Sequence, residues 1–318
     1  MMDTQRGILR CPLCGESLFR TEGGYACPAR HTVDRARQGY TNLLLRPAGQ
    51  HGDNREMILA RREFLESGAY APLADAIVAA AERLAPGAGT FLDAGCGEGY
   101  YGEAVLAALP NAVGYGIDIS REALKVAGRR ETVKNGRFSL FVAGVYEMPF
   151  ADRGFDLVLN VFAPLAAAEY RRVLRPRGVL LMAIPDRRHL IEMKEILYDT
   201  PRENEVADFA LDGLTFLGAE PVKHRFTLTG QAQIDALFSM TPYYYRTPET
   251  GRRRLAALDT LTVTAEFLLL AYRAPEFTEC QGVILNLSKK FIPREESSEM
   301  KSSSEVCQPS SFLGSWFM

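Results

Sequence analysis

Apolar runs that alternate with helical patterns dominate residues 54–273. Five short runs have the length and composition of buried strands: Thr90–Asp93, Val113–Asp118, Phe138–Val142, Asp156–Val161 and Val179–Ile184. Around them, apolar residues recur every three or four positions, which predicts helices: Glu56–Ser67, Pro72–Leu84, Tyr101–Leu109, Arg121–Arg129, Ala166–Leu174 and Arg188–Tyr198. Two β-rich runs, Arg225–Thr229 and Leu261–Tyr272, follow and are expected to close the sheet at its edge. We therefore expect an α/β fold with a mostly parallel, seven-stranded sheet between helices.

The same pattern divides the chain into four parts. Residues 1–46 lack helical periodicity and are rich in Arg and Cys, so they predict a small separate domain. Residues 47–89 are expected to form a linker and a helical cap, and residues 90–273 the sheet domain. Residues 274–318 are dense in Ser, Glu and Lys, which predicts a disordered tail.

The composition is that of a globular protein and does not indicate a binding partner. The 318 residues are 47% hydrophobic and 24% charged, as in a globular protein. The formal net charge of -2 gives no sign of a nucleic-acid partner. No apolar run reaches the roughly 18–20 residues that span a bilayer, and the N-terminus has no apolar signal core. We expect a cytoplasmic protein with no membrane partner.

Four metal-ligating side chains lie close together near the N-terminus. Cys11 and Cys14 are separated by two residues, Cys27 and His31 by three, and the two pairs by twelve. Zinc takes four tetrahedral ligands, and thiolates with an imidazole suit it. The alternative, a redox pair at Cys11 and Cys14, needs a strand-to-helix context that is missing here. We predict a structural zinc ribbon, because the protein fills all four positions.

The predicted ribbon is basic, with seven arginines against four acidic residues in 1–46. Phe19, Tyr25 and Tyr40 lie among these charges. Such a module is suited to gripping phosphates and stacking bases. A purely structural ribbon with solvated arginines is the alternative.

A glycine-rich loop follows the first strand of the large domain. Asp93 ends that strand, and Gly95, Gly97 and Gly99 form a GxGxG pattern rather than the GxGxxG of dinucleotide sites. S-adenosylmethionine has no phosphate, so its loop needs close backbone approach instead, which glycines allow. Asp118 ends the second strand, where a carboxylate can accept both ribose hydroxyls. These features together predict an S-adenosylmethionine site.

Several linked segments resemble a known family. They are the CPxC and CxxxH pairs, Ala36–Leu44 (ARQGYTNLL), Ala60–Leu73 (ARREFLESGAYAPL) and the DAGCGEGYY loop. From about Cys11 to Arg273 the chain resembles the bacterial 23S ribosomal RNA guanine-N1 methyltransferases, a group that includes the enzyme of tylosin-type macrolide resistance. The resemblance implies a Rossmann-like class I methyltransferase domain, a ribbon that helps to bind a ribosomal RNA hairpin, and a homodimer.

The resemblance also implies further site residues. By motif position, Tyr70, Tyr101, Gly102 and His189 match cofactor contacts of the family. One departure concerns the third strand, after which many such enzymes have an acid for the adenine amine. Gly144–Tyr146 stand there instead, so backbone groups must replace the acid.

The predicted reaction needs a proton acceptor. Guanine N1 carries a proton with a pKa of about 9, which must leave before or during attack on the methyl group. Asn160, at the tip of the fourth strand, is our candidate catalytic residue, where it would orient the base edge, and His189 is a candidate base. Asp156 lies at the start of that strand, far from its tip, and is therefore a poor choice for the base. Asn160–Pro164 is not the Asn-Pro-Pro-Tyr of adenine-N6 or glutamine enzymes.

Two other functions fit part of the sequence. A methyltransferase for a small molecule, such as a quinone or natural product, shares the glycine loop but has no use for a basic ribbon. A non-catalytic zinc-ribbon RNA-binding protein could retain the cofactor fold, and only turnover would distinguish it from an enzyme. The sequence does not choose among neighbouring guanines of the hairpin.

Overall fold

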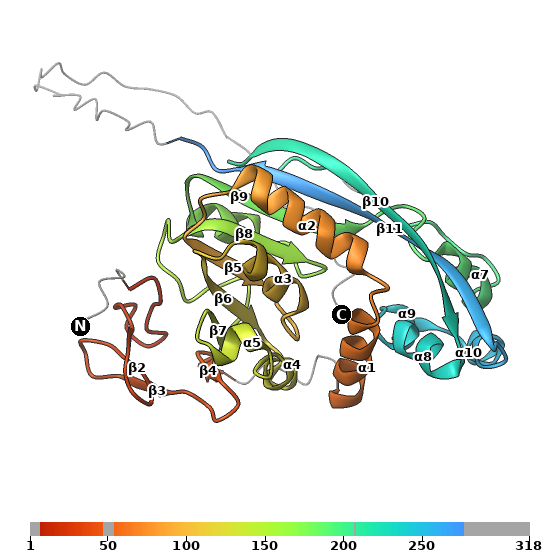
Figure 1. The fold of residues 1–318 in the computed structure, drawn as a ribbon, viewed down its shortest axis with the longest axis horizontal. Coiled ribbons are helices and arrows are strands. Elements are labelled where there is room, and N and C mark those ends of the chain that lie inside the picture. The colour runs from red at the N-terminus through yellow and green to blue at the C-terminus, as the bar shows by residue number, and fades with distance from the viewer. Residues whose placement is uncertain (1–6, 47–53, 207, 277–318) are drawn as a thin grey trace, which may run out of the picture.

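The computed structural model describes residues 7–46, 54–206 and 208–276. Its N-terminal part contains a small antiparallel sheet in the order β1-β2-β3. The strands are β1 (Phe19–Arg20), β2 (Gly24–Ala26) and β3 (Thr32–Asp34). Figure 1 shows this ribbon at one end of the molecule.

An eight-stranded sheet forms the body of the protein, in the order β10-β11-β9-β8-β5-β6-β7-β4. Its strands are β4 (Tyr40–Asn42), β5 (Thr90–Ala94), β6 (Val113–Asp118), β7 (Phe138–Val142), β8 (Phe155–Val161), β9 (Leu174–Pro185), β10 (Thr215–Thr229) and β11 (Thr260–Arg273). All neighbours from β4 to β9 pair in parallel, whereas β11 is antiparallel to both β9 and β10. The mostly parallel sheet is confirmed, and so is its closure at one edge by the two late β-rich runs.

The expected number of seven strands was wrong by one. β4 pairs in parallel with β7, with Tyr40 opposite Leu140 and Asn42 opposite Val142. This strand lies inside the segment expected to form a separate ribbon, so a boundary at residue 46 does not separate the two sheets. Three residues are too few to show a strand pattern in sequence. β10 also begins ten residues before its prediction, because it is an edge strand with mostly exposed residues.

Ten helices complete the described part of the chain. They are α1 (Arg55–Glu66), α2 (Ala71–Leu84), α3 (Tyr100–Ala108), α4 (Arg121–Ala127), α5 (Glu131–Lys134), α6 (Ala167–Val173), α7 (Ile191–Leu197), α8 (Gln231–Ser239), α9 (Tyr243–Arg246) and α10 (Glu249–Ala256). All six predicted helices are present. Helix α1 begins where the Asn54 side chain accepts a hydrogen bond from Met57 N, a standard N-cap.

The core lies on both faces of the large sheet. All five residues of β5 are buried, as expected for a central parallel strand covered on both sides. The core on one face also includes Leu9 and Leu18 of the ribbon. Arg10 N donates to Pro149 O (2.8 Å), and the rings of Tyr25 and Phe141 lie 5.6 Å apart. The ribbon is thus packed and hydrogen-bonded to the larger domain.

Two expectations concern the remaining segments. Within the described residues, no helix combines the length and apolar content that a membrane span requires. The linker at the start of the 47–89 segment, residues 47–53, and all but the first three residues of the predicted tail lie outside the described residues.

Candidate zinc centre and cofactor cavity

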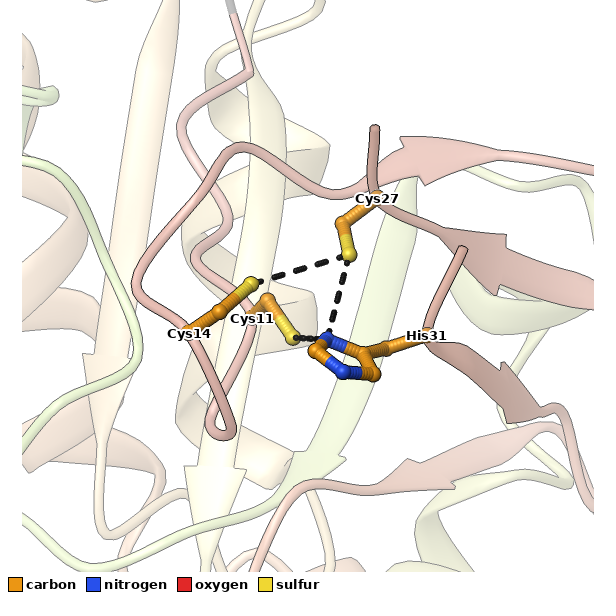
Figure 2. A group of neighbouring side chains, drawn as sticks. All are labelled: Cys11, Cys14, Cys27 and His31. Atoms are coloured by element: carbon orange, nitrogen blue, oxygen red, sulfur yellow. Dashed lines mark hydrogen bonds between the residues drawn. The ribbon is translucent and has the colours of Figure 1, made fainter. Parts of the chain in front are cut away.

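The four predicted zinc ligands meet at one point beside the small sheet. Gly15, whose φ is 73°, closes the first knuckle, in which its N–H donates to Cys11 O (2.8 Å). In the second knuckle Cys27 N donates to His31 O (3.0 Å), just before β3 begins. Figure 2 shows the side chains of Cys11, Cys14, Cys27 and His31 converging.

The spacing of these atoms fits a tetrahedral zinc ion. All four ligand atoms lie within 4.8 Å of one another. The Sγ atoms of Cys14 and Cys27 are 3.7 Å apart, and His31 Nδ1 lies 3.6 Å from Cys11 Sγ and 3.5 Å from Cys27 Sγ. A tetrahedron with Zn–S bonds of about 2.3 Å and a Zn–N bond of about 2.0 Å requires separations of about 3.8 and 3.5 Å. The donor set and its geometry therefore fit a closed, structural site.

At each of the three positions of the GxGxG loop, the structure shows a different reason why glycine is favoured. All three have positive φ, which disfavours any side chain. A Cβ on Gly95 would lie 2.3 Å from Ala163 Cβ, so this position lets the loops after β5 and β8 touch. Gly99 caps α3 and borders the Arg130 side chain. A Cβ on Gly97 would meet no protein atom within 4 Å and would project into open space.

A cavity of about 970 Å³ opens at the carboxyl ends of the parallel strands. Its lining includes seven of the nine predicted cofactor residues: Tyr70, Asp93, Gly95, Gly97, Tyr101, Asp118 and His189. Gly99 and Gly102 are not among its lining residues. Gly102 lies behind Asp93, where a Cβ would come within 2.6 Å of Asp93 Oδ2. The structure brings the predicted residues together, with these two as supports of the wall.

The two acids of the loop region differ in their environment. Burial, reinforced by the carboxylate of Asp118, raises the pKa of Asp93 to about 8. Asp118 accepts hydrogen bonds from Gly97 N (2.9 Å) and Ser120 N (2.7 Å), so it ties the glycine loop to β6. A cationic ligand group beside Asp93 would favour its ionised form.

Tyr70 and His189 form a buried pair, although 119 positions separate them. His189 Nδ1 accepts a hydrogen bond from Glu266 N (3.2 Å), and Nε2 lies 3.5 Å from the Tyr70 hydroxyl. Burial lowers the pKa of His189 to about 3. With Nδ1 occupied and the proton on Nε2, the ring has no lone pair to offer a substrate. This geometry argues against His189 as the base.

Asn160 lies at the cavity and holds the loop that follows β8. Its Nδ2 donates to Ala163 O (3.2 Å) and Pro164 O (3.1 Å), and lies 2.5 Å from the Tyr170 hydroxyl. The side chain is buried and lines the cavity. Asp156, by contrast, accepts from Gly89 N and Thr90 N at the other end of the strand.

Sequence reasoning missed two groups of residues that include a lining residue of the cavity and its support. Glu98, inside the glycine loop, forms a buried ion pair with Arg130, which also pairs with Glu103. Phe162 and Phe267, whose rings are 5.4 Å apart, contact the rings of Tyr101 and His189 respectively. Neither could be found from local patterns, because each joins residues that are distant in sequence.

The ribbon presents fewer aromatic rings to solvent than its composition suggests. Tyr25 packs on Phe141, and Tyr40 packs against the core beside β7. Phe19 is exposed, and so are the arginines Arg20, Arg30, Arg35, Arg37 and Arg46. Of the three candidate stacking residues, Phe19 alone is exposed.

Comparison with known proteins identifies the two parts of the chain. A profile of the methyltransferase domain matches residues 91–178, and a zinc-ribbon profile described as "RlmA, N-terminal" matches residues 9–50. The parallel sheet, the GxGxG loop and the cavity at the strand ends thus belong to a methyltransferase of the class I type. Such a domain implies S-adenosylmethionine as methyl donor, and the Cys–His cluster suggests zinc.

Three relatives are similar over most of their length. A protein of Micromonospora griseorubida is 38% identical and covers 83% of this chain and 97% of its own. The 23S rRNA (guanine(748)-N(1))-methyltransferase of Streptomyces fradiae is 35% identical, with 80% and 94% covered. YxjB of Bacillus subtilis is 34% identical, with 83% and 96% covered. The first and third also bear names for 23S rRNA guanine-N1 methylation. The chain belongs to the family of 23S rRNA (guanine-N1)-methyltransferases.

Proposed function

We propose that this protein transfers the methyl group of S-adenosylmethionine to N1 of a guanine in a hairpin loop of 23S ribosomal RNA. One observation carries the proposal beyond family membership. β4, which follows the ribbon, pairs with β7, and the residues after β7 (Ala143–Tyr146) line the cavity. RNA held by the ribbon would therefore lie at a fixed position relative to the cofactor.

The cofactor fits one part of the cavity in this proposal. Asp118 would accept the ribose hydroxyls, and Asp93 would face the methionine ammonium group. Gly97 leaves the space that the methionine part fills. Backbone groups of Ala143–Val145, at the cavity wall, would contact the adenine in place of an acid. Zinc, bound by its four ligands, would hold the ribbon folded.

The RNA would enter between the ribbon and α9. Tyr146 is 68% exposed at the cavity wall, and Arg246 is an exposed cation at another part of the wall. An exposed ring can stack a base, and an arginine can bind a phosphate. N1 of guanine faces the paired strand in a duplex, so the target must be unpaired or flipped out of the stack.

The reaction is an in-line displacement, in which positioning supplies much of the rate. Asn160 would serve by fixing the Ala163–Pro164 turn, and hence the wall against which the base lies. The neutral Tyr70–His189 pair would complete the wall beside the methyl group.

Primer extension tests the proposal, because N1 methylation blocks the Watson–Crick edge of guanine and halts reverse transcriptase. Unmodified 23S ribosomal RNA would be incubated with the protein, with and without S-adenosylmethionine. We expect a cofactor-dependent stop one nucleotide before a hairpin guanine. No stop from protein that contains zinc and binds the cofactor would contradict the proposal and favour a small-molecule substrate.

A further inference from the structure

Removal of the N1 proton needs an acceptor that the sequence did not reveal. Five carboxylates line the cavity: Asp93, Glu98, Asp118, Glu205 and Asp208. A neutral His189 with both ring nitrogens engaged cannot serve. The acceptor is therefore sought among these acids.

Three of the five already have other roles, in the cofactor site or in holding the loop. Asp93 lies buried behind the loop, close to Gly102. Glu98 pairs with Arg130. Asp118 accepts from two backbone N–H groups and ties the loop to β6.

The remaining two acids lie on the segment between α7 and β10. Asp208 Oδ1 accepts a hydrogen bond from Ala210 N (3.2 Å), so it closes a turn of its own. Glu205 is exposed at the cavity wall, and within the described part of the chain no hydrogen bond or ion pair joins its carboxylate to another residue. Of the five, Glu205 is thus the carboxylate that has neither oxygen engaged by another described residue.

The backbone next to Glu205 is held rigidly. Asn204 is buried, and its Nδ2 donates to Asp186 O (2.7 Å) while its N–H donates to Arg187 O (2.8 Å). Its Oδ1 accepts from Lys194 Nζ (2.5 Å). These bonds attach residue 204 to the loop that continues β9, so Glu205 is carried at the carboxyl end of that strand.

That location is where a methyl acceptor is expected. In open α/β sheets ligands bind outside the carboxyl ends of the strands. The glycine loop after β5 and Asp118 of β6 serve the cofactor. The ends of β8 and β9, where Asn160 and Pro185 line the same cavity, remain for the base.

We propose that Glu205 accepts the N1 proton of the target guanine, an inference that rests on the proposed function. The carboxylate would first accept hydrogen bonds from N1–H and the 2-amino group. As the N1–methyl bond forms, the S–methyl bond breaks, its electron pair stays on sulfur, and the N1 proton passes to Glu205. Adenine has neither donor on that edge, so Glu205 also selects guanine.

Glu205→Gln tests the proposal, because it retains the shape and removes the basic oxygen. Single-turnover methylation would be measured from pH 6 to 9.5 on the RNA and guanine identified by primer extension. At pH 7 we expect the rate to fall about 100-fold or more. The variant's rate should rise about tenfold per pH unit toward the pKa of guanine N1, whereas the wild-type rate should depend much less on pH.

Glu203→Gln is the matched control. Glu203 is an exposed acid two positions away, paired with Arg188 (3.0 Å). This control should retain the wild-type rate and pH profile, and all variants should bind S-adenosylhomocysteine equally. A Glu205→Gln enzyme with a normal rate, or with a reduced rate but a flat pH profile, would overturn the inference. If the wild-type protein itself did not methylate the RNA, that result would instead contradict the proposed function.

Substitution of inosine for the target guanine gives a second readout. Inosine lacks the 2-amino group, so wild-type enzyme should prefer guanine by about tenfold, the value of one hydrogen bond to a charged group. Glu205→Ala, which removes both acceptor oxygens, should lose most of this preference. An unchanged preference would contradict the recognition role.

Discussion

The zinc ribbon and the cofactor loop are both glycine-assisted turns, yet they are stabilised in different ways. Buried apolar residues between 7 and 46 are few, namely Leu9, Leu18 and Leu43 with the two buried ligands Cys11 and Cys27. A cluster of four side chains that fits a zinc ion lies where a larger domain would have an apolar core. The cofactor loop instead follows β5, whose residues are buried on both sheet faces. We therefore expect the fold of the ribbon to depend on a bound metal ion, whereas the fold of the loop depends on the buried strand that precedes it.

The two regions also differ in what their positive-φ residues do. In the ribbon, Gly15 closes the knuckle that brings two sulfurs together. In the cofactor loop, Gly95 permits contact with Ala163, and Gly97 keeps a space open. A glycine pattern alone does not distinguish a residue that packs from one that leaves room for a ligand.

The largest expected effect comes from removing a zinc ligand. Cys27→Ser should abolish zinc binding, which is worth about 10–16 kcal/mol in zinc-finger peptides, and unfold the ribbon. We expect RNA methylation to fall about 100-fold or more while S-adenosylhomocysteine affinity changes less than about twofold. Metal analysis, calorimetry and methylation assays check this.

Cys96→Ser is the control for zinc content, because Cys96 is a buried thiol outside the cluster. It should retain one zinc per chain. Normal methylation by zinc-free Cys27→Ser protein would show that the ribbon is dispensable.

The next effect in size is a difference between alanine substitutions at Gly95 and Gly97, the first acting on stability and the second on ligand affinity. Gly95→Ala brings a Cβ to 2.3 Å from Ala163 Cβ and should lower the free energy of unfolding by about 2–3 kcal/mol. Gly97→Ala should cost only about 1 kcal/mol of backbone strain, but should weaken S-adenosylhomocysteine binding about tenfold. Thermal melts and calorimetry measure the two effects.

The double variant Gly95→Ala/Ala163→Gly removes the clash and should regain part of the lost stability. If Gly97→Ala bound the ligand normally, the cofactor would lie elsewhere in the cavity.

The smallest expected effect is a pH dependence of ligand binding. Since burial raises the pKa of Asp93 to about 8, the ligand-free protein holds a proton there at neutral pH. The ammonium group of S-adenosylhomocysteine would favour the carboxylate over the neutral acid, so affinity should rise by about fivefold in total between pH 6 and 8 and then level off. Calorimetry in two buffers should detect the released proton.

The stability of the ligand-free protein should change with pH in the opposite direction to ligand affinity. The folded-state pKa of Asp93 exceeds that of the unfolded chain, so this group makes the ligand-free protein less stable as the pH rises from about 4 to about 8. Asp93→Asn should remove both trends. Retention of the binding trend in that variant would assign it to another group.

Short-range patterns were sufficient for much of this protein. The strand β7 matches its predicted bounds, Phe138–Val142, because a strand covered on both faces is a nearly continuous apolar run, and four of its five residues are buried. The zinc ligands could be chosen because each knuckle is a local turn of a few residues. Asp93, Gly97 and Asp118 were predicted from the GxGxG loop and from the acids that end the first two strands of the large domain.

Other features depend on residues that meet only after folding. β4 joins the sheet because its three backbone units pair with β7, about a hundred positions away, and so short a strand has no pattern of its own. Tyr70 and His189 are 119 positions apart in sequence and meet only in the fold. The Tyr70 hydroxyl and the Glu266 N–H together engage both ring nitrogens of His189, which argues against this histidine as the base. Glu205 lies in an irregular segment and reaches the cavity through the bonds of Asn204. Periodicity and spacing record local geometry, whereas these contacts arise from the packing of distant segments, which local patterns do not encode.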